Sequence, residues 1–435
     1  MSNSVVGKAI ASVFAQGPGT IKAWNERVLP AVEKTPKIAG ADGRDLVRFL
    51  STADQFDIKD PAILSSAVTL AQSFGYEVTA PRAQSTDPEL YIRRAIAGNV
   101  TEKDAAFLTL AGRAGRGNEH ITQAVAVLDS GMNTDHVGLK NKLWRNPDEL
   151  PGNGKDDDKD GAIDNVIGYD WVDRDPNPNA SEAGYHGNHT SGSATAGTDA
   201  VKVMTMRAFS DSAFRPQDVA DAIDNAAANG ARIISMSFKV RDQPSVDAVK
   251  EAMARHPRIL FVKSAGNDGR ELESYPAQAY LPTNLIDNMA VIAAADADGT
   301  RAKYTNYSPV YATHALRGSK VHSFNGLDDA YGIKSGTSMS TPDGSNTFAK
   351  LLILDPGLDA VQLKQMATDA TEVVPHWADG VASGGVVNKE IAYKLAALSG
   401  LVRRGECDFQ GAADRLGLWG KNADVLIEWA KKYVA

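Results

Sequence analysis

The chain has 435 residues, a formal net charge of −8 and a single cysteine, Cys407. A single cysteine excludes an intrachain disulfide, and the negative charge gives no reason to expect binding to nucleic acid or to an anionic membrane. The length allows two domains, or one large domain with an extension.

The start of the chain shows none of the features of an export signal. Lys8 interrupts a short apolar stretch, and no cleavage site of small residues follows. The sequence also contains no apolar run of about 18 residues, the length that a membrane-spanning helix needs. We therefore expect a cytoplasmic protein with no membrane partner.

Residues 1–90 predict a mainly helical N-terminal extension. Helices are expected over residues 43–50, 61–74 and 88–97. Asp60 and Asp87 are the expected N-caps of the last two, because each precedes a proline that fits the first helical position. Residues 79–86 have the composition of a linker.

Strand-like and helix-like segments alternate through the middle of the chain. Strands are expected over residues 125–129, 201–206, 232–238, 259–262 and 288–295, and helices over 216–229, 246–255 and 347–354. Apolar strands separated by amphipathic helices predict an α/β fold, with a mostly parallel sheet covered by helices on both faces. Ligands of such sheets bind beyond the carboxyl ends of the strands.

Polar residues of kinds that take part in catalysis stand at the ends of these elements. Asp129 ends the first predicted strand, and Asn267 follows the strand at 259–262. His186 opens a helix of small residues. Taken singly, each residue has an ordinary structural explanation, such as a turn-forming aspartate.

Ser338 lies in the sequence Gly-Thr-Ser-Met-Ser-Thr-Pro, which begins at Gly336 and is expected to place the serine hydroxyl at a helix start. The positive end of the helix dipole there favours the negative charge of an acyl-transfer intermediate. We expect Pro342 to be tolerated near the helix start, because N–H groups of the first turn have no intrahelical partner.

An acid, a histidine and a serine in this chain order, with an amide side chain before the serine, resemble the subtilisin-like serine proteases (subtilases). The resemblance extends over about residues 123–389. It implies that His186 takes the proton of Ser338 and that Asp129 holds the imidazole in the required tautomer. It also implies that Asn267 and the backbone N–H of Ser338 stabilise the oxyanion, and that His189 is a structural histidine.

The resemblance further implies which residues border the first specificity pocket. They are Ser237, Phe238, Lys239, Gly266 and Asp268. Lys239 stands where the family usually has glycine, and Asp343 replaces a histidine that is common after the serine motif. Lys239 and Asp268 either form an ion pair at the rim of the pocket or set a charge preference for the substrate.

An aspartate-rich run indicates a calcium site. Asp156, Asp158 and Asp160 alternate and a glycine follows, as in an EF-hand loop, and Asp164 is a fourth carboxylate. Ile167 stands at the twelfth position instead of glutamate, which excludes a complete EF-hand. The wider run 143–171 resembles an insertion found in many bacterial subtilases. A Ca²⁺ site and a solvated acidic loop both remain open.

The expected organisation is an N-terminal extension over 1–90, a subtilisin-like catalytic domain over 91–400 and a C-terminal helical tail over 401–435. A terminal helix over 424–433 is expected to dock on the core through the residues of one face, which are Leu426, Trp429, Ala430 and Tyr433.

The resemblance implies a serine endopeptidase that acts on protein or peptide substrates. The alternatives are a catalytically silent subtilase fold used for binding and a calcium-controlled interaction module. The extension is either a prodomain that occupies the active site until autocleavage, or a permanent accessory domain that docks a regulatory partner. Two segments are expected cut sites, the linker 79–86 and residues 111–117, and the first is preferred because the second lies inside the presumed core.

Overall fold

The computed structural model describes residues 102–434, apart from 118–120, 140, 180–184, 211–213, 277 and 327–329. The predicted extension over 1–90, with its three helices and its linker, lies outside the described residues.

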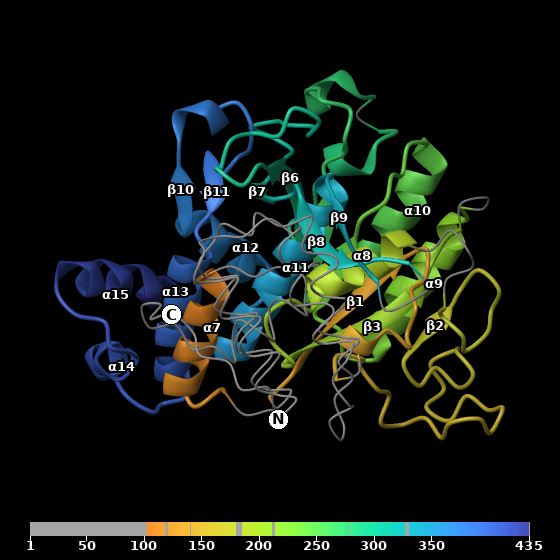
Figure 1. Cartoon of the computed structure of the whole chain (residues 1–435), viewed down its shortest axis with the longest axis horizontal. Coiled ribbons are helices and arrows are strands. Elements are labelled where there is room, and N and C mark those ends of the chain that lie inside the picture. The colour runs from red at the N-terminus through yellow and green to blue at the C-terminus, as the bar shows by residue number, and fades with distance from the viewer. Residues whose placement is uncertain are drawn as a thin grey trace, which may run out of the picture.

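A nine-stranded sheet forms the centre of the described part, in the order β10-β11-β7-β6-β5-β4-β1-β3-β2 (Figure 1). All neighbouring strands are parallel except β10 and β11, and β8 and β9 form a separate antiparallel pair. The strands are β1 Gln123–Asp129, β2 Gly168–Asp170, β3 Val201–Arg207, β4 Ile233–Met236, β5 Leu260–Ser264, β6 Met289–Ala295, β7 His314–Arg317, β8 Val321–Phe324, β9 Tyr331–Lys334, β10 Thr371–Val373 and β11 Gly385–Val387.

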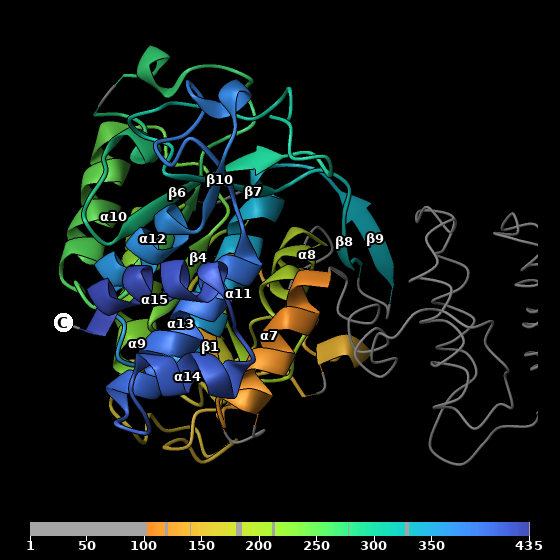
Figure 2. The same cartoon turned by 90° about the vertical axis from the view of Figure 1, so that its left-hand side faces the viewer.

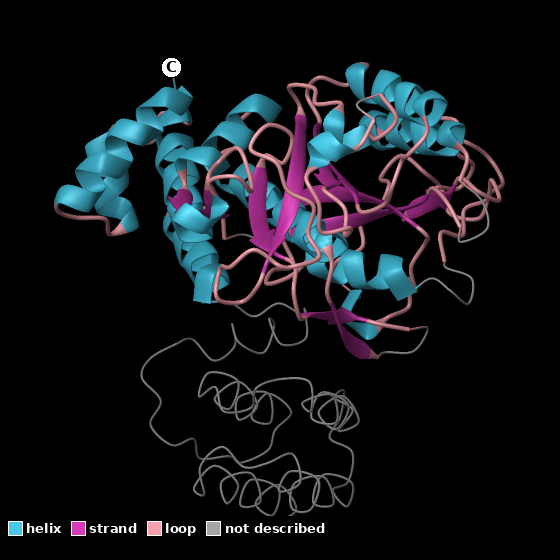
Figure 3. Cartoon of the chain, turned by 90° about the horizontal axis from the view of Figure 1, so that it is seen from above, coloured by secondary structure: helices cyan, strands magenta, loops and turns pink. Residues whose placement is uncertain are grey.

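Helices cover both faces of the sheet (Figure 3). Because side chains alternate along a strand, Val125 and Val127 of β1 face one core, whereas Ala126 and Leu128 face the other. The helices are α7 Glu102–Arg113, α8 Tyr185–Ala194, α9 Pro216–Ala228, α10 Gln243–Ala254, α11 Thr337–Leu354, α12 Ala360–Asp369, α13 Lys389–Arg403, α14 Phe409–Leu416 and α15 Lys421–Val434. The predicted α/β fold with a mostly parallel sheet is confirmed.

No helix in the described part of the chain has both the length and the apolar character needed to span a bilayer.

Helix α10 begins earlier than the predicted position 246. The side chain of Asp242 accepts a hydrogen bond from the backbone N–H of Ser245 at 2.9 Å, and so caps the helix. Pro244 lies in the first turn, where a missing N–H has no cost. The sequence Asp-Gln-Pro-Ser therefore starts the helix instead of forming a loop before it.

Pro342 lies inside α11, beyond its first turn, so the prediction that it falls where N–H groups have no partner is wrong. Its missing N–H leaves the carbonyl of Ser338 without the usual intrahelical donor. The hydroxyl of Ser237 donates to that carbonyl instead, at 3.1 Å. Pro342 thus leaves the Ser338 carbonyl free to accept the hydrogen bond that connects α11 to the segment after β4.

Helices α13, α14, α15 and α7 gather on one side of the molecule (Figure 2). Leu426, Ala430 and Tyr433 of α15 are buried in the core, and Trp429 packs partly buried against it. These residues form the face that the sequence pattern marked as apolar.

Residues 111–117, one of the two expected cut sites, alternate between exposed and buried positions at the end of α7. Ala111 and Ala114 are buried at the end of α7, and the Arg116 side chain donates to the carbonyl of Ile353 at 2.8 Å. A protease needs an extended, accessible backbone, so cleavage here would require local unfolding.

Asp343, which replaces the common histidine, forms an ion pair with Lys389. Both side chains are buried, and the pair joins the middle of α11 to the first residue of α13. Asp343 therefore has a structural partner of its own in this chain.

Candidate active site

The carboxyl ends of three neighbouring strands bring the predicted site residues together. Strands β5, β4 and β1 are adjacent in the sheet. Asp129 is the last residue of β1, Ser237 follows β4 directly, and Asn267 comes three residues after the end of β5. His186 and Ser338 enter from the start of α8 and of α11.

Asp129 is buried, with 2% of its side chain exposed, and it is held by several donors. Its two carboxylate oxygens lie 2.8 and 3.0 Å from Nδ1 of His186. The backbone N–H of Ser130 and the hydroxyl of Thr190 donate to it at 2.8 and 3.0 Å. Sequence analysis missed Thr190, although it lies four residues after His186 on the same helix, where side chains share a face.

These contacts decide the charge of Asp129. Burial by itself would raise the pKa of the carboxyl group, but the charge and the hydrogen bond of His186 act against it. Together with the hydrogen bonds from Ser130 and Thr190, they lower the pKa below its ordinary value. Asp129 is therefore ionised at neutral pH and can accept a hydrogen bond from the Nδ1–H group of His186.

The close approach of α8 to β1 depends on glycine. A Cβ atom at Gly187 would lie 1.9 Å from the carbonyl oxygen of Gly131. Any larger residue at position 187 would push the start of α8 away from β1, and His186 away from Asp129.

His189 does not join this group. Its ring is fully buried, and Nε2 lies 3.0 Å from the carbonyl oxygen of Val321. Burial lowers its pKa to about 3, so the ring is neutral. The structure therefore gives His189 the buried, hydrogen-bonded position expected of a structural histidine.

Ser338 is half-buried, and its hydroxyl donates to the backbone carbonyl of Ser237 at 3.1 Å. Among the described residues, no hydrogen bond joins the Ser338 hydroxyl to the ring of His186, whose side chain is 36% exposed. Catalytic hydrogen bonds are often absent before substrate binds. A rotation about the Cα–Cβ bond of Ser338 is the motion that would redirect the hydroxyl.

Asn267 is oriented by Thr337, a residue that sequence analysis missed although it directly precedes Ser338. The backbone N–H and the hydroxyl of Thr337 both donate to Asn267 Oδ1, at 2.7 and 2.9 Å. A backbone N–H can only donate, so the amide oxygen must be the atom that faces Thr337. The Nδ2 group of Asn267 is consequently left to donate elsewhere, and Asn267 is exposed.

Gly266, predicted to bind substrate, is buried and engaged by the protein itself. Its N–H donates to the Thr337 hydroxyl at 3.1 Å, and its φ of 107° suits glycine alone. A Cβ atom there would lie 2.2 Å from the hydroxyl of Tyr280. The structure thus shows Gly266 fixing the backbone before Asn267, and a contact with substrate stays a prediction.

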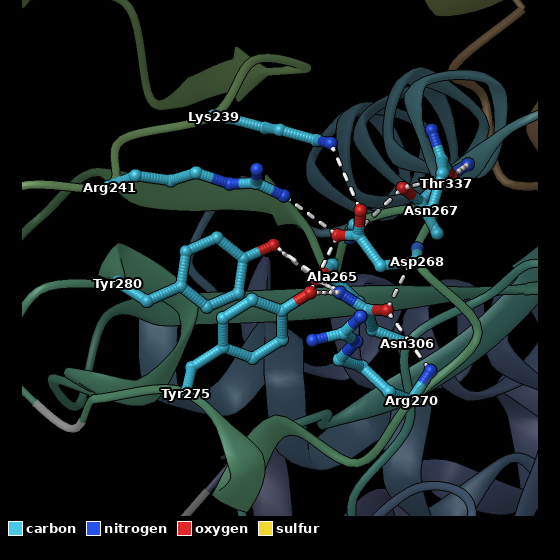
Figure 4. Close-up of polar contacts among 11 residues, drawn as sticks. Lys239, Arg241, Ala265, Asn267, Asp268, Arg270, Tyr275, Tyr280, Asn306 and Thr337 are labelled. Atoms are coloured by element: carbon cyan, nitrogen blue, oxygen red, sulfur yellow. Dashed lines mark hydrogen bonds and ion pairs between the residues drawn. The ribbon is translucent and has the colours of Figure 1, made fainter.

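The other predicted substrate-binding residues surround Asn267 and Ser338. Ser237 and Phe238 are buried, whereas Lys239 and Asp268 are exposed. Lys239 Nζ lies 3.5 Å from Asp268 Oδ1, so the expected rim ion pair is present (Figure 4). Arg241 and Tyr275, which sequence analysis missed, contact the same carboxylate, at 2.8 and 2.6 Å.

The acidic loop brings together a different set of carboxylates from the one predicted. Asp156 and Asp158 lie beside Glu149, with one carboxylate oxygen of each within 4.8 Å of the others. Asp160 is turned toward the side-chain amides of Asn165 and Asn229. Asp164 accepts from the backbone N–H groups of residues 153 and 154. Asp160 and Asp164 lie outside this group of three, and their part in binding a metal ion stays a prediction.

Glu149 fits a hard cation such as Ca²⁺. Only 5% of the residue is exposed, and Oε1 accepts from the N–H groups of Asp157 and Asp158 at 2.7 and 3.2 Å. Within the described residues Oε2 is buried without any hydrogen-bond partner. A buried, unpartnered carboxylate oxygen is costly, and oxygen ligands are those that Ca²⁺ takes.

Comparison with known proteins points to one family. A family model described as the subtilase family matches residues 121–390. The chain is similar to subtilisin-like protease 1 of Plasmodium vivax, with 27% identity over 299 residues, which cover 62% of this chain and 47% of that protein. It is also similar to halolysin of Haloferax mediterranei, with 31% identity over 230 residues, or 50% of this chain and 39% of that one. The matches thus span less than half the length of these relatives.

Solved structures share the fold. A lanthipeptide protease aligns with a TM-score of 0.53 and 16% identity, over 68% of this chain and 96% of the other. A structure described as the structural basis of subtilase cytotoxin SubAB assembly aligns with a TM-score of 0.52 and 18% identity, over 69% of this chain and 99% of the other.

Proposed function

Since the chain belongs to the subtilase family, we propose that it is a serine endopeptidase that hydrolyses peptide bonds in protein or peptide substrates. The observation that carries the proposal is the buried Asp129 carboxylate on Nδ1 of His186 in α8, with Ser338 at the start of α11, a helix that packs against α8.

The contact between Asp129 and His186 supports a general base in this site. A carboxylate accepts hydrogen bonds, so the ring proton resides on Nδ1 and the lone pair on Nε2. That lone pair takes the proton of Ser338 as Oγ attacks the substrate carbonyl. His186 then returns the proton to the leaving amine, and water hydrolyses the acyl-enzyme by the same steps.

Stabilisation of the oxyanion is assigned to Asn267 Nδ2 and the backbone N–H of Ser338. In the described part of the chain, neither group meets an acceptor. The N–H belongs to the first turn of α11, where the helix dipole favours a negative charge. Both donors are fixed before substrate arrives, which is the condition for effective electrostatic catalysis.

A fluorophosphonate probe tests the proposal directly, because it reacts only with an activated serine. We expect the probe to label the wild-type protein. A wild-type protein that takes up no probe would favour the catalytically silent alternative, in which the fold serves only for binding.

For the acidic loop we propose a Ca²⁺ site that includes Glu149, Asp156 and Asp158. Such an ion would neutralise the charge of these carboxylates and stabilise the loop. The support is the cluster itself and the unpartnered Oε2 of Glu149. The alternative is an acidic loop that needs no ion.

Ca²⁺ is expected to raise the melting temperature of metal-stripped protein, because an ion that binds only the folded state stabilises it by about 2.7 kcal/mol at 100 times its Kd. Glu149→Gln should abolish the rise, whereas Glu428→Gln, which removes an exposed carboxylate on α15, should retain it. Asp164→Asn should retain it as well, since Asp164 is outside the cluster. Equal melting curves for wild type with Ca²⁺ and with chelator would contradict the site.

We also propose that the N-terminal extension is a prodomain. Full-length protein is expected to convert with time to a shorter species by cleavage within 79–86, while Ser338→Ala stays whole, as followed by intact mass. Cleavage at 111–117 is not expected, because α7 extends to Arg113 and the side chains of Ala111 and Ala114 are buried. A wild-type protein that remains full length and fully active would make the extension an accessory or partner-docking domain.

The cytoplasmic location and the absence of nucleic-acid and membrane partners stay predictions.

A further inference from the structure

Two cationic side chains contact Asp268, the residue that follows Asn267, and a third, Arg270, follows Asp268 by two residues. Lys239 and Arg241 converge on its carboxylate (Figure 4). Arg270 stacks on Tyr275, with its guanidinium carbon 5.7 Å from the ring centre. Arg270 forms no ion pair with any described carboxylate. We call Lys239, Arg241 and Arg270 the basic rim.

Asp268 cannot balance this charge. Burial would raise its pKa, but the hydrogen bond from Tyr275 and the charges of Lys239 and Arg241 lower it to about 2. The carboxylate is therefore ionised throughout the neutral range, and its oxygens are already occupied by three donors. One negative charge faces the three positive charges of the basic rim.

A buried lysine, Lys263, lies near Lys239 of the basic rim. Lys263 is 1% exposed, and its Nζ donates to the Ser264 hydroxyl at 3.0 Å and to the carbonyl of Phe238. It pairs with no carboxylate in the described part of the chain, and its Nζ is 5.3 Å from the centre of the Phe238 ring. Burial, together with the charge of Lys239, lowers the pKa of Lys263 to about 7, and an anion bound nearby would favour its protonated form.

The basic rim lies beside the place where one particular substrate side chain would begin. The carbonyl under attack has its oxygen at Asn267, and the side chain of the same residue begins only two bonds from the carbonyl carbon. That side chain therefore starts close to Asn267 and its neighbour Asp268. It also starts close to Ser338, whose hydroxyl contacts the Ser237 carbonyl, two residues before Lys239.

On the basis of the proposed function, we propose that this protease cleaves after an acidic residue, whose carboxylate binds the basic rim. The Lys239 side chain is the member of the basic rim best placed to leave Asp268 and pair with the substrate carboxylate. Its contact with Asp268, at 3.5 Å, is longer than those of Arg241 and Tyr275, and its side chain is 44% exposed. Asp268 is bonded to Arg241 and Tyr275. It therefore holds Arg241 in position and is not free to attract a basic substrate residue.

Three peptides that differ only at the residue before the scissile bond test the proposal, with Glu, Gln or Lys at that position. Each exposed ion pair is expected to change kcat/KM by about two- to fivefold. Two such contacts predict about a tenfold preference for Glu over Gln, with Lys the poorest. The preference should shrink in high salt, because exposed charges are screened.

Variants separate the basic rim from the general charge of the protein. Lys239→Gln and Arg270→Gln should each lower the ratio of Glu to Gln cleavage by about two- to fivefold. Arg255→Gln is the matched control, since Arg255 is an exposed arginine that pairs with Asp224 on the other side of the sheet from α11. It should leave the ratio unchanged.

Labelling by the fluorophosphonate probe, measured on the same samples, tells the two proposals apart. A labelled enzyme that cleaves the Gln or Lys peptide as well as the Glu peptide overturns the acidic preference alone. A ratio that Lys239→Gln and Arg255→Gln change equally also overturns it. A protein that neither takes up the probe nor cleaves any peptide overturns the proposed function, and the preference with it.

Discussion

Replacing Ser338 by alanine is expected to abolish peptide hydrolysis, with a loss of several orders of magnitude in kcat. The substitution removes the hydroxyl that we propose as the nucleophile and leaves the helix start intact, because the other bonds of that segment come from Thr337 and the backbone. The same loss is expected for His186→Ala. The double variant should be little worse than either single one, since the two residues act in one step.

Steady-state kinetics on one peptide, with probe labelling as a second readout, check this expectation. Ser335→Ala is the matched control, because Ser335 is an exposed serine three residues before Ser338. It should retain labelling and turnover. Substantial turnover in purified Ser338→Ala would show that another group is the nucleophile.

Asn267→Ala is expected to lower kcat by about 10²–10³-fold and to leave KM nearly unchanged, because the lost hydrogen bond forms in the transition state. Thr337→Val should have a smaller effect in the same direction. It removes the hydroxyl that donates to Asn267 Oδ1 at 2.9 Å and keeps the backbone donor at 2.7 Å. The amide of Asn267 would then be held less firmly.

The separation of kcat from KM is the decisive measurement for this pair. A rise in KM at constant kcat would mean that Asn267 binds the ground state and that the oxyanion assignment is wrong. The melting temperatures of both variants need to be measured beside the kinetics, because Thr337 also accepts the N–H of Gly266 inside the core.

The sequence by itself determined the fold class, and it located the candidate site residues at the ends of predicted strands and helices. The apolar strands are buried on both faces, so their pattern is continuous and hard to mistake, and β1, β3 and β6 lie within two residues of their predicted bounds. Parallel strands place their carboxyl ends at one edge of the sheet. Residues at or just after the ends of such strands, such as Asp129 and Asn267, therefore lie at the same edge of the sheet.

Only the tertiary structure decided how those residues are supported. Thr190 and Thr337 hold Asp129 and Asn267, and both lie close to a predicted site residue in sequence, but threonine carries no signal until its hydroxyl has a partner. The reciprocal bonds between Ser237 and Ser338 join residues 101 positions apart. No local pattern predicts such a contact.

The acidic loop shows the same limit most clearly. Alternating aspartates suggest that all of them face one ion, yet the chain turns Asp160 and Asp164 toward amide donors and brings in Glu149 from outside the run. Loop conformation follows from which hydrogen bonds can be satisfied together, and that depends on partners distant in sequence, such as Asn229. Sequence spacing located the acidic loop, whereas the folded backbone selected the carboxylates that lie together.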